Sequence, residues 1–203
     1  MQHLDNGIMV SKHELMEALA SKVQICRKCP LWMTRKQAVL GDGDINTSVL
    51  FIGEAPGYWE DVKGRPFVGA AGKLFDERLS DIGLRRRDVY VTNVIKCRPP
   101  DNRDPLQLEI NACAPYLTQQ IKIVAPKLLV TLGRHATACV FREADLEFGG
   151  ITKVHGRVYN SSILGLDMLL FPMFHPAAAL YNPRYRDAIE ADFQLLESRL
   201  QSP

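Results

Sequence analysis

The chain has 203 residues, of which 46% are hydrophobic and 24% charged, and its formal net charge is +2. This composition is typical of a globular protein that folds around its own core, whereas the small net charge neither indicates nor excludes nucleic-acid binding. No apolar stretch approaches the roughly 20 residues of a membrane-spanning helix, and the first residues lack the apolar segment of a secretory signal. We therefore expect one domain over residues 1–203, located in the cytoplasm and without a membrane partner.

Short apolar strands alternate with helices along the chain. Residues 11–22 begin with a capping pattern, Ser11 and Glu14, followed by leucines at helical spacing, and residues 26–43 read as irregular. Pro115 is expected to kink or split the helix around it. The predicted strands are 48–52, 89–95, 127–132 and 168–173; the further predicted helices are 72–82, 105–124, 134–141 and 183–200; residues 149–160 read as a loop or hairpin.

Polar residues follow three of these strands. Glu54, Asn93 and His175 each stand at or just beyond a strand end. Alternating strands and helices indicate a parallel sheet covered on both faces, and the carboxyl ends of parallel strands meet at one edge. The sequence therefore predicts that these three side chains share one cleft.

Four cysteines indicate a metal site. Cys26 and Cys29 form a C-x-x-C pair, and Cys97 and Cys113 follow much later. Intracellular cysteines seldom form structural disulfides, so zinc or an iron–sulfur cluster is the expected use, and the wide spacing slightly favours the cluster. Cys139 lies in an apolar string and is expected to be a buried small side chain.

Four segments occur in order with these cysteines: GEAPGYWED (53–61), GRPFVGAAGKLF (64–75), VTNVIKCRPPDNRDP (91–105) and FHPAAAL (174–180). Together they resemble family 4 of the uracil-DNA glycosylases, the iron–sulfur enzymes of bacteria and archaea. The resemblance implies a three-layer α/β/α sandwich with a four-stranded parallel central sheet. It also implies hydrolysis of the N-glycosidic bond of uracil in DNA, which initiates base excision repair. The alternatives are a non-catalytic module for damaged or single-stranded DNA and a glycosylase for another deaminated base.

The resemblance also implies roles for residues of the cleft. His175 is expected beside uracil O2, Asn93 at the N3 and O4 edge, Phe67 stacked on the ring and Glu60 near C5, with Gly53 and Ala55 lining the pocket. Glu54 is the candidate for orienting water or balancing the cationic sugar, and the competing interpretation is a carboxylate that binds loop backbone. Asp61 is expected to hold its loop.

The remaining implied contacts are with DNA and with the cofactor. Uracil-containing DNA, single- or double-stranded, is the expected partner of a monomer. Ala179 or Leu180 is expected to fill the gap left by the flipped base, and Lys153, His155 and Arg157 either track phosphates or are merely solvated. The basic triplet 85–87 is interpreted as a solvated loop. Cys26, Cys29, Cys97 and Cys113 match the family's ligands for a [4Fe–4S] cluster.

Overall fold

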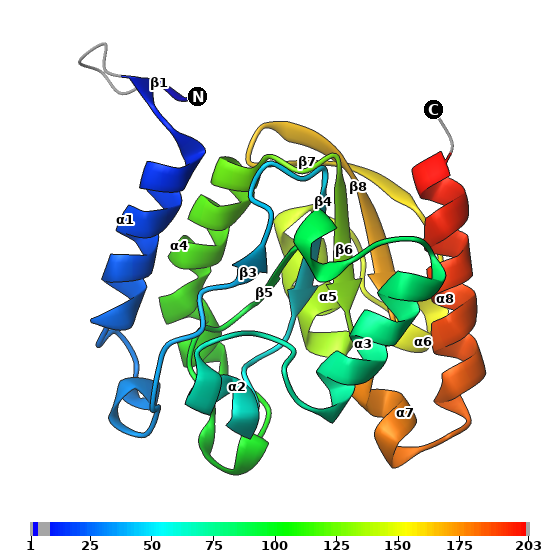
Figure 1. Ribbon diagram of the computed structural model, residues 1–203, viewed down its shortest axis with the longest axis horizontal. Helices are drawn as coiled ribbons and strands as arrows, with labels where there is room; N and C mark the ends of the chain where they lie inside the picture. The colour runs from blue at the N-terminus through cyan, green and yellow to red at the C-terminus, as the bar shows by residue number, and fades with distance from the viewer. Residues whose placement is uncertain (1, 4–8, 202–203) are drawn as a thin grey trace.

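The computed structural model describes residues 2–3 and 9–201 (Figure 1). Its centre is a mixed six-stranded sheet in the order β3-β5-β4-β6-β8-β7. The pairs β4–β5, β4–β6 and β6–β8 are parallel, whereas β3 and β7 add antiparallel edges. These strands are β3 (Asp42–Gly43), β4 (Val49–Gly53), β5 (Tyr90–Asn93), β6 (Leu128–Leu132), β7 (Tyr159–Ile163) and β8 (Leu166–Met173). The sheet is thus larger than the expected four-stranded parallel one, because two short edge strands carry little apolar signal.

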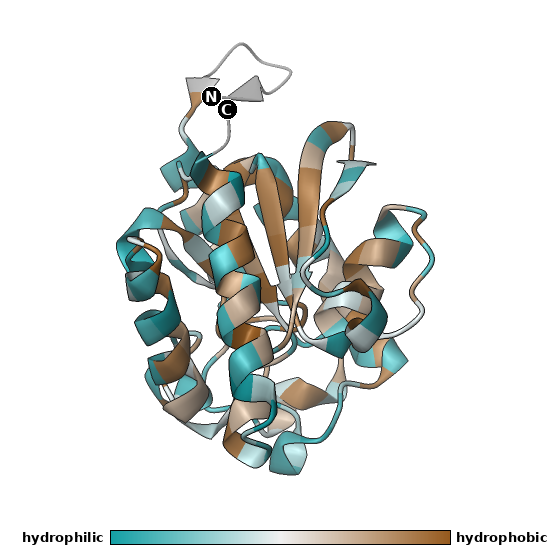
Figure 2. Cartoon of the chain, turned by 90° about the vertical axis from the view of Figure 1, so that its right-hand side faces the viewer, coloured by the Kyte–Doolittle hydropathy of each residue, from teal (hydrophilic) through white to brown (hydrophobic). Residues whose placement is uncertain are grey.

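Helices cover both faces of the sheet. One apolar core joins the sheet to α1 (Lys12–Gln24), α4 (Gln107–Val124) and α5 (Arg134–Glu143), and the other joins it to α3 (Ala70–Asp81), α7 (Ala177–Tyr181) and α8 (Tyr185–Gln201). Both faces of the sheet are apolar because successive side chains of a strand point to opposite faces. In β4, Leu50 and Ile52 enter the first core, while Val49 and Phe51 enter the second. Figure 2 shows the strands mainly in the hydrophobic colour between helices of mixed colour. The layers are those of an α/β/α sandwich.

Helix ends follow the sequence signals. Ser11 caps α1 in a capping box with Glu14, as predicted. Gly83 adopts a φ of +72° just beyond the end of α3, a conformation that favours glycine. The shorter elements are α2 (Tyr58–Lys63), α6 (Ile151–Val154), the 3₁₀ turns η1 (Pro30–Met33), η2 (Arg86–Asp88) and η3 (Pro100–Asn102), and the pair β1 (Gln2–His3) and β2 (Met9–Val10).

The predicted split of a helix at Pro115 is wrong, because α4 runs unbroken from Gln107 to Val124. Pro115 and Asn111, whose carbonyl loses its hydrogen bond, both lie on the exposed face of the helix. Water can therefore bind that carbonyl, while the buried face of α4 holds the helix together. Residues 149–160, expected to be a loop or hairpin, contain α6 and the start of β7, which forms a hairpin with β8.

Within the described ranges, no helix is long and apolar enough to cross a bilayer. The expectation about a secretory signal concerns the first residues, of which 1 and 4–8 lie outside the described part.

Candidate active site

The three polar strand ends meet at one edge of the sheet, as predicted. Glu54 directly follows β4, Asn93 ends β5, and His175 lies two residues beyond β8. Gly53 and Asn93 are paired in the parallel register of β4 and β5. Phe67, from the loop between α2 and α3, places its ring 5.5 Å from the His175 ring in a stacked arrangement. We call Glu54, Glu60, Phe67, Asn93 and His175 the strand-end site.

Asn93 has an unusual environment. Its side chain is 1% exposed, and neither Oδ1 nor Nδ2 has a hydrogen-bond partner among the described residues. Burying an unpaired amide costs about 1–3 kcal/mol, so native proteins rarely keep one. Gly53 allows this packing, since a Cβ at that position would collide with Asn93 Oδ1 and lie 2.8 Å from Phe67 Cζ. The Glu60 side chain lies next to this amide but makes no hydrogen bond of normal geometry with it, so the carboxamide is available to a partner from outside the protein.

The hydrogen bond at His175 defines its tautomer. The backbone N–H of Ala177 donates to His175 Nδ1 at 3.1 Å, so the ring proton of the neutral form resides on Nε2. Burial lowers the pKa of His175 to about 4, although one edge of the ring faces a cavity. At neutral pH the ring is uncharged and offers a single N–H donor.

Phe67 is held in a strained backbone conformation. Its φ is +54°, which is rare for a bulky side chain. Arg86 donates from Nη2 to the Phe67 carbonyl at 2.9 Å, and its guanidinium also pairs with Asp76 at 2.7 Å. Arg86 belongs to the basic triplet that was interpreted as solvated, so for this residue that interpretation is wrong. It fixes the loop that carries Phe67.

Glu60 and Asp61, adjacent on α2, have different surroundings. Burial raises the pKa of Glu60 to about 7, against weaker opposing effects of the Gly57 and Phe67 backbone, Arg86 and the Asn93 side chain. Glu60 therefore borders the Asn93 amide. Asp61 is 2% exposed and accepts from the backbone N–H of Lys36 at 2.9 Å, so its role is structural, but it ties α2 to the segment around Lys36 rather than holding its own loop.

Glu54 opens onto a cavity of about 320 Å³ that is also lined by Ala55, Arg103, His175 and Tyr181. Burial raises the pKa of Glu54, while His135 Nε2, 3.9 Å away, opposes the rise. In the part of the chain that the structure describes, the Glu54 carboxylate accepts no hydrogen bond from loop backbone. His135, which no sequence motif singled out, is held in turn by Asp104 at 3.1 Å.

The residues expected to contact DNA differ in how exposed they are. Leu180 is 49% exposed on α7, whereas Ala179 is only 6% exposed and packs into the core, which excludes it as the inserted residue. Lys153 and Arg157 are exposed. His155 pairs with the buried Asp192 at 2.8 Å and packs on Phe174, so its ring already has structural partners.

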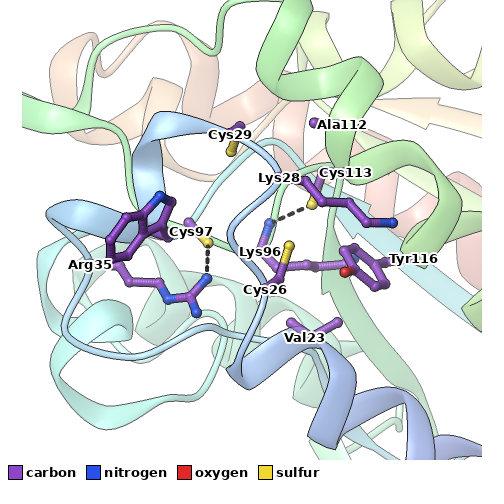
Figure 3. A pocket seen from close by; sticks show the side chains of 11 residues that line it. Val23, Cys26, Lys28, Cys29, Arg35, Lys96, Cys97, Ala112, Cys113 and Tyr116 are labelled. Atoms are coloured by element: carbon purple, nitrogen blue, oxygen red, sulfur yellow. Dashed lines mark hydrogen bonds between the residues drawn. The ribbon is translucent and has the colours of Figure 1, made fainter.

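The four predicted ligand cysteines line one pocket beside α1 and α4 (Figure 3). Arg35 donates to Cys97 Sγ at 3.0 Å, and the Lys96 backbone N–H donates to Cys113 Sγ at 3.2 Å. Cys139 lies outside this cysteine pocket, 7% exposed in the core, as predicted.

The donor set suits an iron–sulfur cluster better than one zinc ion. Zinc with bonds of about 2.3 Å holds its sulfur ligands only about 3.8 Å apart. In the described ranges, no three of these sulfurs lie within 4.8 Å of one another. Burial raises the pKa of Cys113 to about 11 and also raises the pKa of Cys29 and Cys97, and a metal that binds such thiols displaces their protons.

Lys96 joins the two sites and was missed by the sequence reading. Its side chain is 1% exposed, and Nζ donates to Thr92 Oγ1 at 2.8 Å and to the Asn93 carbonyl. Burial lowers the pKa of this amine to about 8. The same residue thus supports the end of β5 and, through its backbone, Cys113.

The sequence is similar to a known protein family and to several of its members. The family model of the uracil DNA glycosylase superfamily matches residues 40–197. A type-4 uracil-DNA glycosylase of Saccharolobus solfataricus is 48% identical over 188 residues, covering 92% of this chain and 87% of the relative. One of Thermotoga maritima is 45% identical and covers 86% and 88%. A type-5 uracil-DNA glycosylase of Pyrobaculum aerophilum is 30% identical and covers 77% and 73%. The chain belongs to the uracil DNA glycosylase superfamily, and within it to the type-4 uracil-DNA glycosylases.

Proposed function

We propose that this protein flips uracil out of DNA and hydrolyses the bond between the base and its deoxyribose, leaving an abasic site. A base within a duplex is inaccessible, so it must leave the stack before it can react. As the bond breaks, the uracil ring gains negative charge and the sugar becomes cationic. The site must therefore recognise the ring, stabilise an oxyanion and supply water.

The observation that carries this proposal is the unpartnered carboxamide of Asn93 beside a neutral histidine. The amide oxygen can accept from uracil N3–H, and the amide nitrogen can donate to O4. Cytosine presents the reverse pattern and would leave both groups unpaired, which is a strong basis for rejection. Because Asn93 is closed off from solvent, its neighbours must move apart when the base enters.

His175 would donate a hydrogen bond from its Nε2–H to uracil O2. A donor that is already oriented stabilises the developing oxyanion without reorganisation during the reaction. The Ala177 N–H preserves that orientation by occupying Nδ1.

Phe67 would stack on the flipped base. The His175 and Phe67 rings are inclined by only 28°, so a base lying edge to edge with the imidazole would turn its face toward Phe67. Stacking on an aromatic side chain contributes about 1–3 kcal/mol per base. Glu60, next to the Asn93 amide, would restrict the remaining edge of the ring and so disfavour the methyl group of thymine.

Glu54 would orient the attacking water or balance the charge on the sugar, because its carboxylate faces the same cavity as His175. His135, whose Nε2 lies 3.9 Å from this carboxylate, would act behind it as a positioning residue. Leu180 is the remaining candidate for insertion into the DNA, and Lys153 and Arg157 are available for phosphate contacts.

A [4Fe–4S] cluster would be held by Cys26, Cys29, Cys97 and Cys113. When bound it would act as a structural clamp, because the hydrolysis itself requires no electrons. The clamp would fix the segment around η1 against α4 and the loop after β5, to which all four cysteines belong.

The test is cleavage of a labelled single-stranded oligonucleotide with one uracil, followed by alkali, beside an otherwise identical thymine oligonucleotide. Strand breakage at uracil alone supports the proposal. An intact uracil strand, with folded protein that carries its visible cluster absorbance, would contradict it.

A further inference from the structure

Helix α2 presents two large aromatic side chains to solvent next to the strand-end site. Tyr58 is 44% exposed and Trp59 is 56% exposed, and their rings meet edge to face at 5.1 Å. Glu60, which borders Asn93, is the next residue along the chain. Adjacent exposed aromatics of this size usually mark a binding surface.

Two cations accompany these rings. Lys36 Nζ lies 5.4 Å from the centre of the Tyr58 ring, and Arg98 Cζ lies 5.2 Å from it. Neither cation has a carboxylate within 4.0 Å in the described part of the chain, although Arg98 donates to Asn102 Oδ1 at 2.7 Å. The aromatic surface therefore carries positive charge that the protein does not neutralise.

The helix that carries the aromatics is fixed to the segment that carries Lys36. Asp61 accepts from the backbone of Lys36, and Gln37 Nε2 donates to the Val62 carbonyl at 2.7 Å. A rigid platform loses little conformational entropy when a ligand binds. Trp59 also lies near the loop that carries Phe67, since its Cδ1 is 4.0 Å from where a Cβ on Gly69 would be.

We propose that Tyr58, Trp59, Lys36 and Arg98 form a binding platform for single-stranded DNA that flanks the target nucleotide. An unpaired base stacks on Trp59 beside the Tyr58 ring, over which both cations lie, and the cations contact neighbouring phosphates. Exposed π-faces with uncompensated positive charge match an unpaired strand, whereas the bases of a duplex keep their faces stacked on one another. The inference rests on the proposed function for its target nucleotide, but the binding itself requires no cleavage.

The first test measures anisotropy of a labelled thymine oligonucleotide that contains no uracil. Trp59→Ala and Tyr58→Ala are each expected to weaken binding by about 5–100-fold, and Tyr58→Phe to stay near the original value. Leu200→Ala is the matched control, because Leu200 is an exposed apolar residue at the end of α8, far from α2 in Figure 1. Unchanged affinity in both alanine variants would overturn the platform. An equal loss on a duplex would overturn its assignment to single strands.

The cations are tested through salt dependence. Lys36→Ala and Arg98→Ala should each reduce the slope of log affinity against log salt by about 0.7 on a single strand. Unchanged slopes in both variants would contradict the phosphate contacts.

Fluorescence separates this inference from the proposed function. The chain has two tryptophans, Trp32 and Trp59, so in a Trp32→Phe protein the emission reports Trp59 alone. Uracil-free single-stranded DNA should quench that emission, and unquenched emission at saturating DNA would contradict stacking. Quenching in a protein that leaves uracil uncleaved would support the platform and refute the glycosylase mechanism.

Discussion

The strand-end site and the cysteine pocket differ in what holds their side chains in place. The two sites share the segment that runs from Asn93 to Cys97. In the strand-end site the donors and acceptors are oriented by backbone: His175 by the Ala177 N–H, and Asn93 by the end of β5 and its close packing on Gly53. In the described part of the cysteine pocket no three sulfurs lie within 4.8 Å of one another, and burial raises the pKa of Cys29, Cys97 and Cys113. The protein alone holds the groups of the first site in place, whereas the second, in the function proposed above, would need a metal cluster to hold its three segments together.

The largest effect is expected from removing one thiol of the cysteine pocket, because that pocket would depend on its cluster. Cys97→Ser should lose visible absorbance and reduce bound iron from about four atoms per chain to nearly none, with a lower melting temperature and soluble yield. Iron analysis and thermal unfolding measure this.

Cys139→Ser is the matched control, because Cys139 is equally buried but lies outside the cysteine pocket. Full iron content in Cys97→Ser, or equal loss in both variants, would contradict the assignment of the ligands.

Removing the His175 N–H donor should slow the cleavage step without weakening DNA binding. His175→Ala is expected to lower kcat by about 10²–10³-fold, as for the loss of one oxyanion donor, while DNA affinity and iron content change little. Single-turnover cleavage and binding measurements separate the two effects. His13→Ala, an exposed histidine on α1, should resemble the original protein. Parallel losses of rate and affinity in His175→Ala would instead indicate a structural histidine.

A smaller effect on activity is expected from removing Arg86, the largely buried cation that holds the Phe67 loop. Arg86→Ala removes a charged hydrogen bond to the Phe67 carbonyl and an ion pair, so the stability of the loop should fall by about 1–3 kcal/mol. We expect a roughly tenfold loss in kcat/KM for uracil cleavage, by the conversion of about 1.4 kcal/mol to a factor of ten. Arg87→Ala, on an exposed neighbour, is the control. Equal activity of the two variants would show that Phe67 holds its conformation unaided.

The smallest effect concerns Glu60 and depends on pH. Its folded pKa of about 7 lies above the ordinary value, so folding favours the protonated form, and stability is lost as the pH rises through 7. Glu60→Gln should therefore melt about 2–4 °C higher than the original protein at pH 8.5, the shift expected for roughly 1 kcal/mol, and the difference should disappear at pH 4. A difference that does not vary with pH would refute the raised pKa.

Sequence reasoning brought Glu54, Asn93 and His175 together because they stand where apolar strands stop, and the topology of a parallel sheet places such ends at one edge. Glu60 and Phe67 were expected there only from the family resemblance. It could not locate Arg86, Lys96 or His135, since each acts through a contact between distant segments. A buried lysine such as Lys96 has no local signal, because its partners are one hydroxyl and one carbonyl. Ala179 was misplaced for a related reason: which side of a five-residue helix is buried depends on packing against α3 and α8. The expected monomer and cytoplasmic location stay predictions.

In the proposed site, Asn93 is kept unpaired so that its amide can read the base. The most direct measurement compares Asn93→Leu with the original protein for both uracil cleavage and thermal unfolding. Leucine has the branching and the number of side-chain heavy atoms of asparagine but no polar atoms, so we predict at least a 100-fold loss of activity together with a higher melting temperature, by about 2–6 °C, as the cost of the buried amide disappears. A variant that is less stable but still cleaves uracil normally would contradict the claim and make Asn93 a structural residue.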